Sequence, residues 1–262
     1  MSDPLTISVA EHVATVMLNR PDKANAVNLE LLDALTEAGR ELAANRSVRA
    51  VVLAGAGDNF CAGIDVSLFQ GAFEFDAGAM APLEDSPANR FQSAAYVWQQ
   101  LPVPVICAIH GVAFGAGLQI ALGADLRYAR PDARLAIMEI KWGLIPDMAL
   151  TTTLRDILPV DKVKELAWSG RPVSGAEAQA MGLVTALHDE PLAASMEAAA
   201  GIAGRSPDAI RATKQLVNSA WRLADVDALA LEAELQLGVM GKKNQLEAVM
   251  ANVQKRAPDF DD

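Results

Sequence analysis

Hydrophobic and polar residues alternate at the beginning of the chain, in the stretches TISVA and HVATVML (residues 6–10 and 12–18). This period of two predicts β-strands, because successive side chains of a strand point to opposite faces. Residues 28–45 follow a helical period instead. The hydrophobic residues that share one face of this predicted helix are Leu31, Leu32, Leu35, Ala38 and Leu42. VRAVVLAG (residues 48–55) is a short hydrophobic run, typical of a strand that is buried on both faces.

The same order of elements recurs further along the chain. VPVICAIHG (residues 103–111) predicts a strand, AGLQIALG (116–123) a helix and ADLRYA (124–129) another strand. Strands that alternate with helices predict an α/β fold. From about Pro191 the pattern becomes helical throughout, and we expect these last helices to pack on the core or on a neighbouring subunit. The four predicted helices span residues 191–204, 206–221, 225–241 and 242–257.

Residues 67–90 interrupt this regular order. The segment has weak periodicity and contains the large hydrophobic residues Phe69, Phe73, Phe75 and Met80. Long irregular segments inside compact domains are usually lids, binding loops or disordered. We interpret this one as a lid that faces the substrate, with a plain surface loop as the alternative.

The composition narrows the class of protein. The 262 residues are 52% hydrophobic and 21% charged, as in a globular chain, and the formal net charge is −11. Such an acidic chain is a poor match for the phosphate backbone of nucleic acids. The two cysteines, Cys61 and Cys107, form no CxxC pair, no hydrophobic run is long enough for a membrane span, and the first residues do not resemble a targeting peptide. These observations predict a cytoplasmic protein without nucleic-acid or membrane partners.

Two glycine-containing stretches follow predicted strands and are candidates for a catalytic role. NFCAGIDV (residues 59–66) turns sharply at Gly63, and FGAGLQIALG (114–123) opens a predicted helix. Backbone N–H groups at such places are unpaired and can stabilise a developing negative charge. Two of them that converge on one oxygen would form an oxyanion hole. The alternative is two ordinary strand-to-helix turns, in which glycine serves only close packing.

Other kinds of site fit the sequence poorly. Ile120 stands where a GxGxxG dinucleotide motif needs its third glycine, and no Walker lysine motif occurs. The three histidines are scattered without a metal-ligand spacing, and His110 at a strand end is interpreted as structural. Cys61 has no base near it in the sequence, which favours a buried thiol over a nucleophile.

Two acidic residues remain as candidates for proton transfer. Glu139 lies at the edge of a hydrophobic run in RLAIMEIKWGLIPD (residues 134–147), and Asp147 ends this stretch. A carboxylate in a cavity can act as a general acid or base. The alternative for Glu139 is a surface acid paired with Lys141. The alternative for Asp147 is a helix N-cap.

Taken together, these motifs resemble the crotonase superfamily, the enoyl-CoA hydratase/isomerase family. LNRPDKANAVN (residues 18–28) resembles its first CoA-contacting loop, and NFCAGIDVS (59–67) its first oxyanion stretch. PVICAIHGVAFGAGLQIALGADLRYA (104–129) resembles the most recognisable signature of the family, and LAIMEIKWGLIPD (135–147) its catalytic strand and turn. QLEAVMANVQKRAPDF (245–260) resembles its closing helix. The likeness covers almost the whole chain, in the family's order.

The resemblance implies a crotonase fold, with a spiral of ββα units in residues 1–195 and a C-terminal helical region in residues 196–262 that builds trimers, often paired into hexamers. It implies an acyl-CoA thioester as the substrate, with no metal ion and no cofactor beyond the coenzyme A of that substrate. The backbone N–H groups of Ile64 and Ala116 would hold the thioester carbonyl. The residues that the resemblance places against CoA or the substrate are Lys23, Ala24, Ala62, Asp65 and Gly115.

The sequence departs from the hydratases of this family, which hold and ionise a water molecule with two glutamates. Glu139 matches the second, but Gln119 occupies the first position, and an amide orients water without transferring a proton. The spacing of Glu139 and Asp147 resembles that of the family's dienoyl-CoA isomerases, which usually keep a third acid where Gln119 stands.

We therefore favour a proton-shifting isomerase of unsaturated acyl-CoA over two alternatives. In this interpretation Glu139 is the principal base, Asp147 is the second acid or base, and Gln119 orients substrate or water. The first alternative is an enoyl-CoA hydratase that works with a single glutamate. The second is a catalytically quiet protein that only binds acyl-CoA.

Overall fold

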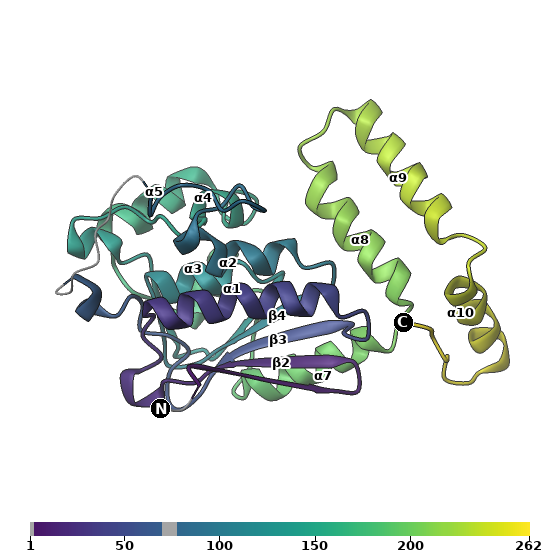
Figure 1. Ribbon diagram of the computed structural model, residues 1–262, viewed down its shortest axis with the longest axis horizontal. Helices are drawn as coiled ribbons and strands as arrows, with labels where there is room; N and C mark the ends of the chain where they lie inside the picture. The colour runs from purple at the N-terminus through teal and green to yellow at the C-terminus, as the bar shows by residue number, and fades with distance from the viewer. Residues whose placement is uncertain (1–2, 70–77) are drawn as a thin grey trace.

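A computed structural model of the chain describes residues 3–69 and 78–262, and it has the α/β architecture expected from the sequence (Figure 1). The main sheet has six strands in the order β1-β2-β3-β4-β6-β9. β1 and β2 are antiparallel, whereas all other neighbours are parallel. The strands are β1 (Leu5–Ala10), β2 (Val13–Leu18), β3 (Ala50–Gly55), β4 (Val105–Ile109), β6 (Leu126–Ala129) and β9 (Ala186–Leu187).

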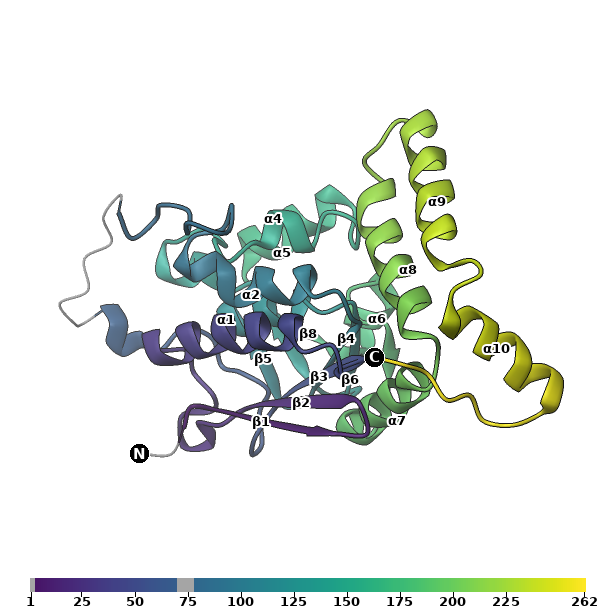
Figure 2. The ribbon, with the colours of Figure 1, turned by 45° about the vertical axis from the view of Figure 1, so that its right-hand side comes forward.

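Helices cover both faces of this sheet (Figures 1 and 2). Three of them lie on one face: α1 (Leu29–Ala44), α2 (Arg90–Gln100) and α3 (Ala116–Leu122). α7 (Pro191–Ala203) lies on the other face. In β3, Val51 and Leu53 belong to the larger hydrophobic core, whereas Ala50 and Val52 pack in a second core with α7. The uninterrupted hydrophobic run of this strand therefore serves two faces, as the sequence predicted.

A small second sheet positions the segments that carry the candidate site. Its strands are β5 (Val112–Phe114), β7 (Arg134–Ala136) and β8 (Val173–Ser174). β5 and β7 end at the same level, where Phe114 pairs with Ala136. The last hydrogen bond between them runs from the N–H of Gly115 to the Ala136 carbonyl at 2.9 Å, and the chain then turns into α3. The chain after β7 then forms the 3₁₀ turn η3 (Glu139–Trp142), so Glu139 lies beyond the strand.

The remaining core helices are α4 (Leu150–Thr153), α5 (Val160–Ser169) and α6 (Gly175–Met181), and the sequence analysis predicted none of them, nor α2. α2 begins with a capping box, in which the Asn89 side chain and the Gln92 side chain each accept a hydrogen bond from the other's backbone N–H. Within the part of the chain that the structure describes, no helix is long and hydrophobic enough to cross a bilayer.

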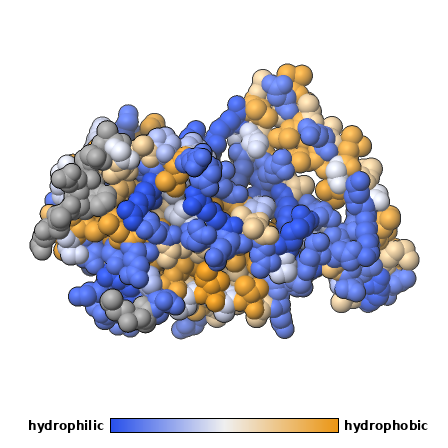
Figure 3. All heavy atoms as spheres, viewed as in Figure 1, coloured by the Kyte–Doolittle hydropathy of each residue, from blue (hydrophilic) through white to orange (hydrophobic). Residues whose placement is uncertain are grey.

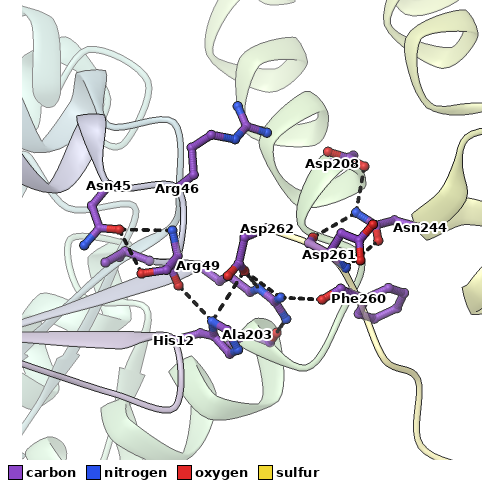
Figure 4. A network of polar contacts seen from close by, with 12 residues as sticks. His12, Asn45, Arg46, Arg49, Ala203, Asp208, Asn244, Phe260, Asp261 and Asp262 are labelled. Carbon is purple, nitrogen blue, oxygen red and sulfur yellow. Dashed lines mark hydrogen bonds and ion pairs between the residues drawn. The ribbon is translucent and has the colours of Figure 1, made fainter.

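Three C-terminal helices extend away from the core (Figures 1 and 2). They are α8 (Pro207–Ala220), α9 (Asp225–Val239) and α10 (Lys243–Gln254). The following tail returns to the sheet, where the Arg49 guanidinium binds the Asp262 carboxylate at 2.7 Å and the Phe260 carbonyl at 2.8 Å (Figure 4). The expected boundary between residues 195 and 196 falls inside α7, which packs on the sheet, and the division into two domains stays a prediction.

The described parts of the predicted lid lie on either side of residues 70–77, which are outside the described residues. On one side, η2 (Val66–Phe69) is a 3₁₀ turn. On the other side, an ion pair of 2.6 Å between Arg40 and Asp85 joins the chain to α1, and Arg90 pairs with Asp33 of the same helix. The interpretation as a substrate-facing lid stays a prediction.

Candidate functional site

The two glycine-containing stretches lie side by side. The N–H of Cys61 donates to the Val112 carbonyl at 2.9 Å, and the Cys61 carbonyl accepts from the N–H of Phe114 at 3.0 Å. Gly117 allows this close approach, because a Cβ atom there would lie 2.5 Å from the Cys61 carbonyl oxygen. Glycine thus serves close packing here, as the alternative interpretation proposed, and the same packing joins the two stretches into one site.

The backbone amides of Ile64 and Ala116 lie where these stretches meet. Gly63 has a φ of +101°, and a Cβ atom on it would lie 2.8 Å from the Phe114 carbonyl oxygen and 3.9 Å from the nitrogen of Ala116. Among residues 3–69 and 78–262, neither amide donates a hydrogen bond. For Ala116 the reason is its place at the first position of α3, where an N–H has no partner within the helix.

The orientation of the Ile64 peptide follows from its neighbours. The N–H of Val27 donates to the Gly63 carbonyl, and the N–H of Asp65 donates to the Val27 carbonyl, both at 2.8 Å. In this parallel bridge the flanking peptides face Val27, so the N–H of Ile64 faces the other way. Both Ile64 and Ala116 line the same cavity.

This cavity has a volume of about 300 Å³. It brings together seven of the ten residues that the sequence analysis proposed for the site: Ala62, Ile64, Gly115, Ala116, Gln119, Glu139 and Asp147. Its other walls are mostly hydrophobic. The sequence analysis named only Phe69 among them, as part of the predicted lid, because the same residue types fill any core. These walls include Val66, Phe69, Phe91, Phe114, Met138, Trp142, Leu144 and Met148.

The other three proposed residues lie outside the cavity walls. Lys23 is exposed at the end of the 3₁₀ turn η1 (Pro21–Lys23), and the Ala24 carbonyl accepts a hydrogen bond from the N–H of Ala62. The Asp65 carboxylate binds Arg20 at 3.1 Å and the Ser67 hydroxyl at 2.8 Å, and these hydrogen bonds lower its pKa despite partial burial. Asp65 thereby fixes the loop that carries Ile64.

Asn25 is a structural residue of the site that sequence reasoning missed. It is fully buried in the left-handed conformation, with a φ of +56°. Its side-chain amide donates to the carbonyls of Ala56 and Asn59, and its side-chain oxygen accepts from the N–H of Arg20. The local signal was available, because asparagine tolerates this conformation better than most residues.

Glu139 is buried, with 8% of its surface exposed, which rules out the interpretation as a surface acid. Its Oε1 atom accepts a hydrogen bond of 2.6 Å from the Gln119 amide, whereas its Oε2 atom is buried without a hydrogen-bond partner. Burial raises the pKa of this carboxyl, and the nearby charge of Asp147 adds to the effect. Gly115 leaves room for the carboxylate, because a Cβ atom at that position would lie 3.2 Å from Oε1.

The Gln119 side chain connects α3 to the segment that contains Glu139 and Met148. The side chain projects from α3 and is 1% exposed. Its Oε1 atom accepts from the backbone N–H of Met148 at 2.9 Å, which leaves the Nε2 group to donate to Glu139. The amide thus holds the Glu139 carboxylate and the peptide that follows Asp147. Both ends of the amide therefore bind protein partners, and its role in orienting substrate or water stays a prediction.

Asp147 lies at the mouth of the cavity and does not cap a helix, because α4 begins at Leu150 with Ala149 as its N-cap. Partial desolvation by the cavity walls raises the pKa of its carboxyl. Its charge also raises the pKa of Glu139. Two acids, one buried and one at the mouth, therefore face one hydrophobic cavity.

The other candidate chemistries find no support in this geometry. Cys61 is fully buried, and burial raises the pKa of its thiol to about 12, so it is not a thiolate nucleophile. The His110 ring lies 2.9 Å from the Gly57 carbonyl, in agreement with its structural interpretation. Among the described residues, no three His, Cys, Asp or Glu side chains are grouped as metal ligands.

Comparisons with known proteins agree with this geometry. The family model for enoyl-CoA hydratase/isomerase matches residues 8–262. YngF of Bacillus subtilis (strain 168), which is named as an enoyl-CoA hydratase/isomerase, is 34% identical over 264 residues, covering 98% of this chain and 97% of YngF. The mitochondrial Delta(3,5)-Delta(2,4)-dienoyl-CoA isomerase of Mus musculus is 32% identical over 259 residues, covering 95% of this chain and 79% of that protein.

Solved structures give the same result. The crystal structure of enoyl-CoA hydratase from Bacillus anthracis matches with a TM-score of 0.88 at 31% identity, and the match covers 98% of each chain. The predicted crotonase fold is therefore confirmed. With its sequence matched over residues 8–262 and its fold shared with solved relatives, the chain belongs to the enoyl-CoA hydratase/isomerase family.

Proposed function

We propose that this protein is a proton-shifting isomerase of unsaturated acyl-CoA thioesters. The observation that carries the proposal is Glu139, which lines the hydrophobic cavity and whose Oε2 atom is buried with no hydrogen-bond partner. Burial raises the pKa of this carboxyl, and a raised pKa makes its carboxylate a stronger base for proton transfer.

The proposed reaction moves one proton and adds no atom. The N–H groups of Ile64 and Ala116 bind the thioester oxygen, and Glu139 removes a proton from a carbon of the acyl group. The electron pair moves to the thioester oxygen, where the two N–H groups stabilise the enolate. For a dienoyl substrate Asp147, protonated at the start, gives its own proton to the far end of the conjugated system, and the two carboxyl groups then return to their starting states by exchanging protons with solvent. For a single double bond Glu139 returns the proton that it removed.

Enoyl-CoA hydratase is the second candidate, because relatives of similar identity carry hydratase names as well as isomerase names. Gln119 disfavours it. A hydratase of the two-glutamate kind needs a second carboxylate to ionise water, and the amide of Gln119 is already bound to Glu139 and to Met148. A quiet acyl-CoA binder is the third candidate, and an unpaired buried carboxylate oxygen argues against it because such a group lowers stability without a compensating role.

One assay separates the three candidates. Purified protein is offered a 2-enoyl-CoA, a 3-enoyl-CoA and a 3,5-dienoyl-CoA, and the absorbance of the conjugated thioester is followed. We expect conjugated product from the 3-enoyl or 3,5-dienoyl substrate. Loss of the 2-enoyl signal instead would establish hydration and overturn the proposal. Saturable binding without any change in absorbance would establish the quiet binder.

We also propose which residues of the site bind coenzyme A. Lys23 and Ala24 would lie along the CoA moiety, and Ala62 and Gly115 would contact the thioester end, as both line the cavity. Asp65 would act through Arg20, by holding the loop that positions Ile64. No metal ion or redox cofactor takes part in this proposal.

The C-terminal helices are proposed to build a homotrimer, which can pair into a hexamer. α9 has no buried residue, and hydrophobic side chains gather over α8 and α9 (Figure 3). The exposed hydrophobic residues of this region include Trp221, Val226, Leu229, Leu237, Met240 and Val253. Light scattering should give a mass of three or six chains, and Leu229→Glu should lower it. A monomer for the unchanged chain would overturn this part of the proposal.

A further inference from the structure

Two short 3₁₀ turns each join a part of the site to a hydrophobic wall residue. In a 3₁₀ helix residues three apart point to the same side. In η3, Glu139 and Trp142 have this spacing, and in η2, Val66 and Phe69 have it. All four side chains line the cavity. The turns therefore set the hydrophobic residues at fixed positions relative to the carboxylate and to the Ile64 amide.

Phe69 and Trp142 meet across the mouth of the cavity. Their ring centroids are 6.1 Å apart, with the ring planes inclined by 36°. The Lys141 ammonium lies 5.3 Å from the Trp142 ring centroid, which favours one orientation of the indole. The two rings thus contact each other and form a hydrophobic wall that joins η2 to η3.

A second hollow of about 310 Å³ lies on the outer side of the same side chains. Its described walls are Val66, Phe69, Trp142 and Leu144, and all four also line the inner cavity. The inner cavity, at about 300 Å³, is at the lower end of the volumes typical of ligand sites. A substrate that fills it with the thioester and the reacting carbons has its tail directed at the outer hollow.

The exposure of these walls points to the same occupant. Val66, Phe69, Trp142 and Leu144 are 44%, 40%, 48% and 46% exposed, although burial would stabilise each of them. Contiguous exposed hydrophobic side chains at the opening of a ligand cavity are typical of a binding groove. Because all four described walls of the outer hollow also line the cavity that holds the carboxylates, its natural occupant is the remote end of the same ligand.

We propose that Phe69 and Trp142 are the residues that determine acyl specificity. The acyl tail packs along this ring pair and extends into the outer hollow, so the preferred substrates are acyl-CoA thioesters whose hydrocarbon chain extends several carbons beyond the reacting double bonds. The inference rests on the proposed function for the identity of the ligand as an acyl-CoA. It adds the length of the acyl group and the residues that select it.

The test measures binding of saturated thioesters, which neither isomerase nor hydratase chemistry consumes. Calorimetric titration with butanoyl-, octanoyl- and dodecanoyl-CoA compares the unchanged chain with Trp142→Ala and Phe69→Ala. Each buried methylene should tighten binding by up to about fourfold in the unchanged chain. Both variants should lose most of this gain while they keep their affinity for butanoyl-CoA.

Two controls identify the cause of any change. Trp168→Ala removes an indole that is 72% exposed on α5 and lines neither hollow, and it should leave all three affinities unchanged. Trp142→Phe keeps a ring and should restore much of the chain-length dependence.

Equal affinity for all three thioesters in the unchanged chain, or an unchanged dependence in both alanine variants, would overturn the inference. Neither result would touch the proposed reaction, and absence of turnover would not affect this measurement.

Discussion

Two buried charged residues, Lys214 in α8 and Glu139 in the site, have nearly the same exposure of 9% and 8%. Lys214 is fully paired: its Nζ group donates to the Asp125 carboxylate at 2.7 Å and to the carbonyls of Val103 and Trp98 at 2.9 and 3.4 Å. Glu139 has one partner for Oε1 and none for Oε2. Similar burial therefore accompanies very different pairing.

The difference indicates what each charge does. Burying a charge is unfavourable unless hydrogen bonds and an opposite charge replace water. Lys214 receives an opposite charge and three hydrogen bonds, although burial still lowers the pKa of its ammonium group, and it attaches α8 to the core, which is a structural role. Among the described residues, Glu139 is the only one with a buried carboxylate oxygen that lacks a partner. An acid left in this state, with a raised pKa and a cavity beside it, is a candidate for catalysis.

The largest expected effect is on turnover in Glu139→Gln. The amide keeps the shape of the side chain and can still accept from Gln119, but it cannot take a proton. We expect the rate to fall by about 10²–10⁴, the usual contribution of a general base, with acyl-CoA affinity largely kept. Steady-state kinetics and calorimetry on the same preparation measure both. Full activity in this variant would remove Glu139 from the role of base.

The converse change, Lys214→Met, should act on stability. It leaves the Asp125 carboxylate with the N–H of Val105 as a partner but without its counter-charge. Breaking a buried pair in this way is expected to lower the free energy of unfolding by about 3 kcal/mol. Thermal unfolding would show this as a fall of roughly 6–12 °C in Tm. Lys164→Met, on the exposed surface of α5, is the matched control and should change little.

The comparison also shows which features the sequence could predict. The period of two in β2 and the hydrophobic run of β3 identified strands, and the glycine stretches around Gly63 and Gly115 identified the site, because these signals are local. The pairing of Gln119 was not local: its partners Glu139 and Met148 are 20 and 29 residues away. No pattern within the stretch EIKW distinguishes a buried glutamate from a surface one.

The cavity walls were unpredictable for a related reason. Phe69 and Trp142 are hydrophobic residues like those of any core, and only the meeting of η2 with η3 gives them a common function. The helix α2 was missed as well, although its signal is local: Phe91, Ala94, Ala95 and Trp98 are spaced as one helical face, and all four are buried. Local patterns predicted the scaffold and the reacting groups, whereas specificity depends on contacts between distant segments.

Asp147→Asn tests whether the two acids of the site, Glu139 and Asp147, have different roles. Asp147 lines the same cavity and its charge raises the pKa of Glu139. The proposed mechanism needs Asp147 only for the dienoyl substrate. We expect dienoyl isomerisation to fall by roughly 10², at the low end for loss of an acid or base, while isomerisation of a single double bond survives. Parallel assays with 3-enoyl-CoA and 3,5-dienoyl-CoA measure this. Equal losses with both substrates would contradict the two-carboxylate mechanism.

The smallest expected effect is on the stability of Glu139→Gln. Removal of the charge of Lys214 should lower the free energy of unfolding, whereas removal of the charge of Glu139 should raise it. Burial raises the pKa of Glu139 above its ordinary value of 4.5, so the folded state binds this proton more tightly than the unfolded state does. Ionisation therefore destabilises the fold, and the loss in free energy of unfolding develops as the pH rises from below the ordinary pKa through the raised one.

At neutral pH this loss is present, and Glu139→Gln should recover about 1 kcal/mol, or roughly 2–4 °C in Tm. The gain should shrink toward zero below the ordinary pKa, where the glutamate is protonated as well. A variant less stable than the unchanged chain at neutral pH would mean that the carboxylate is held as firmly as Lys214 is, and the contrast between the two buried charges would be lost.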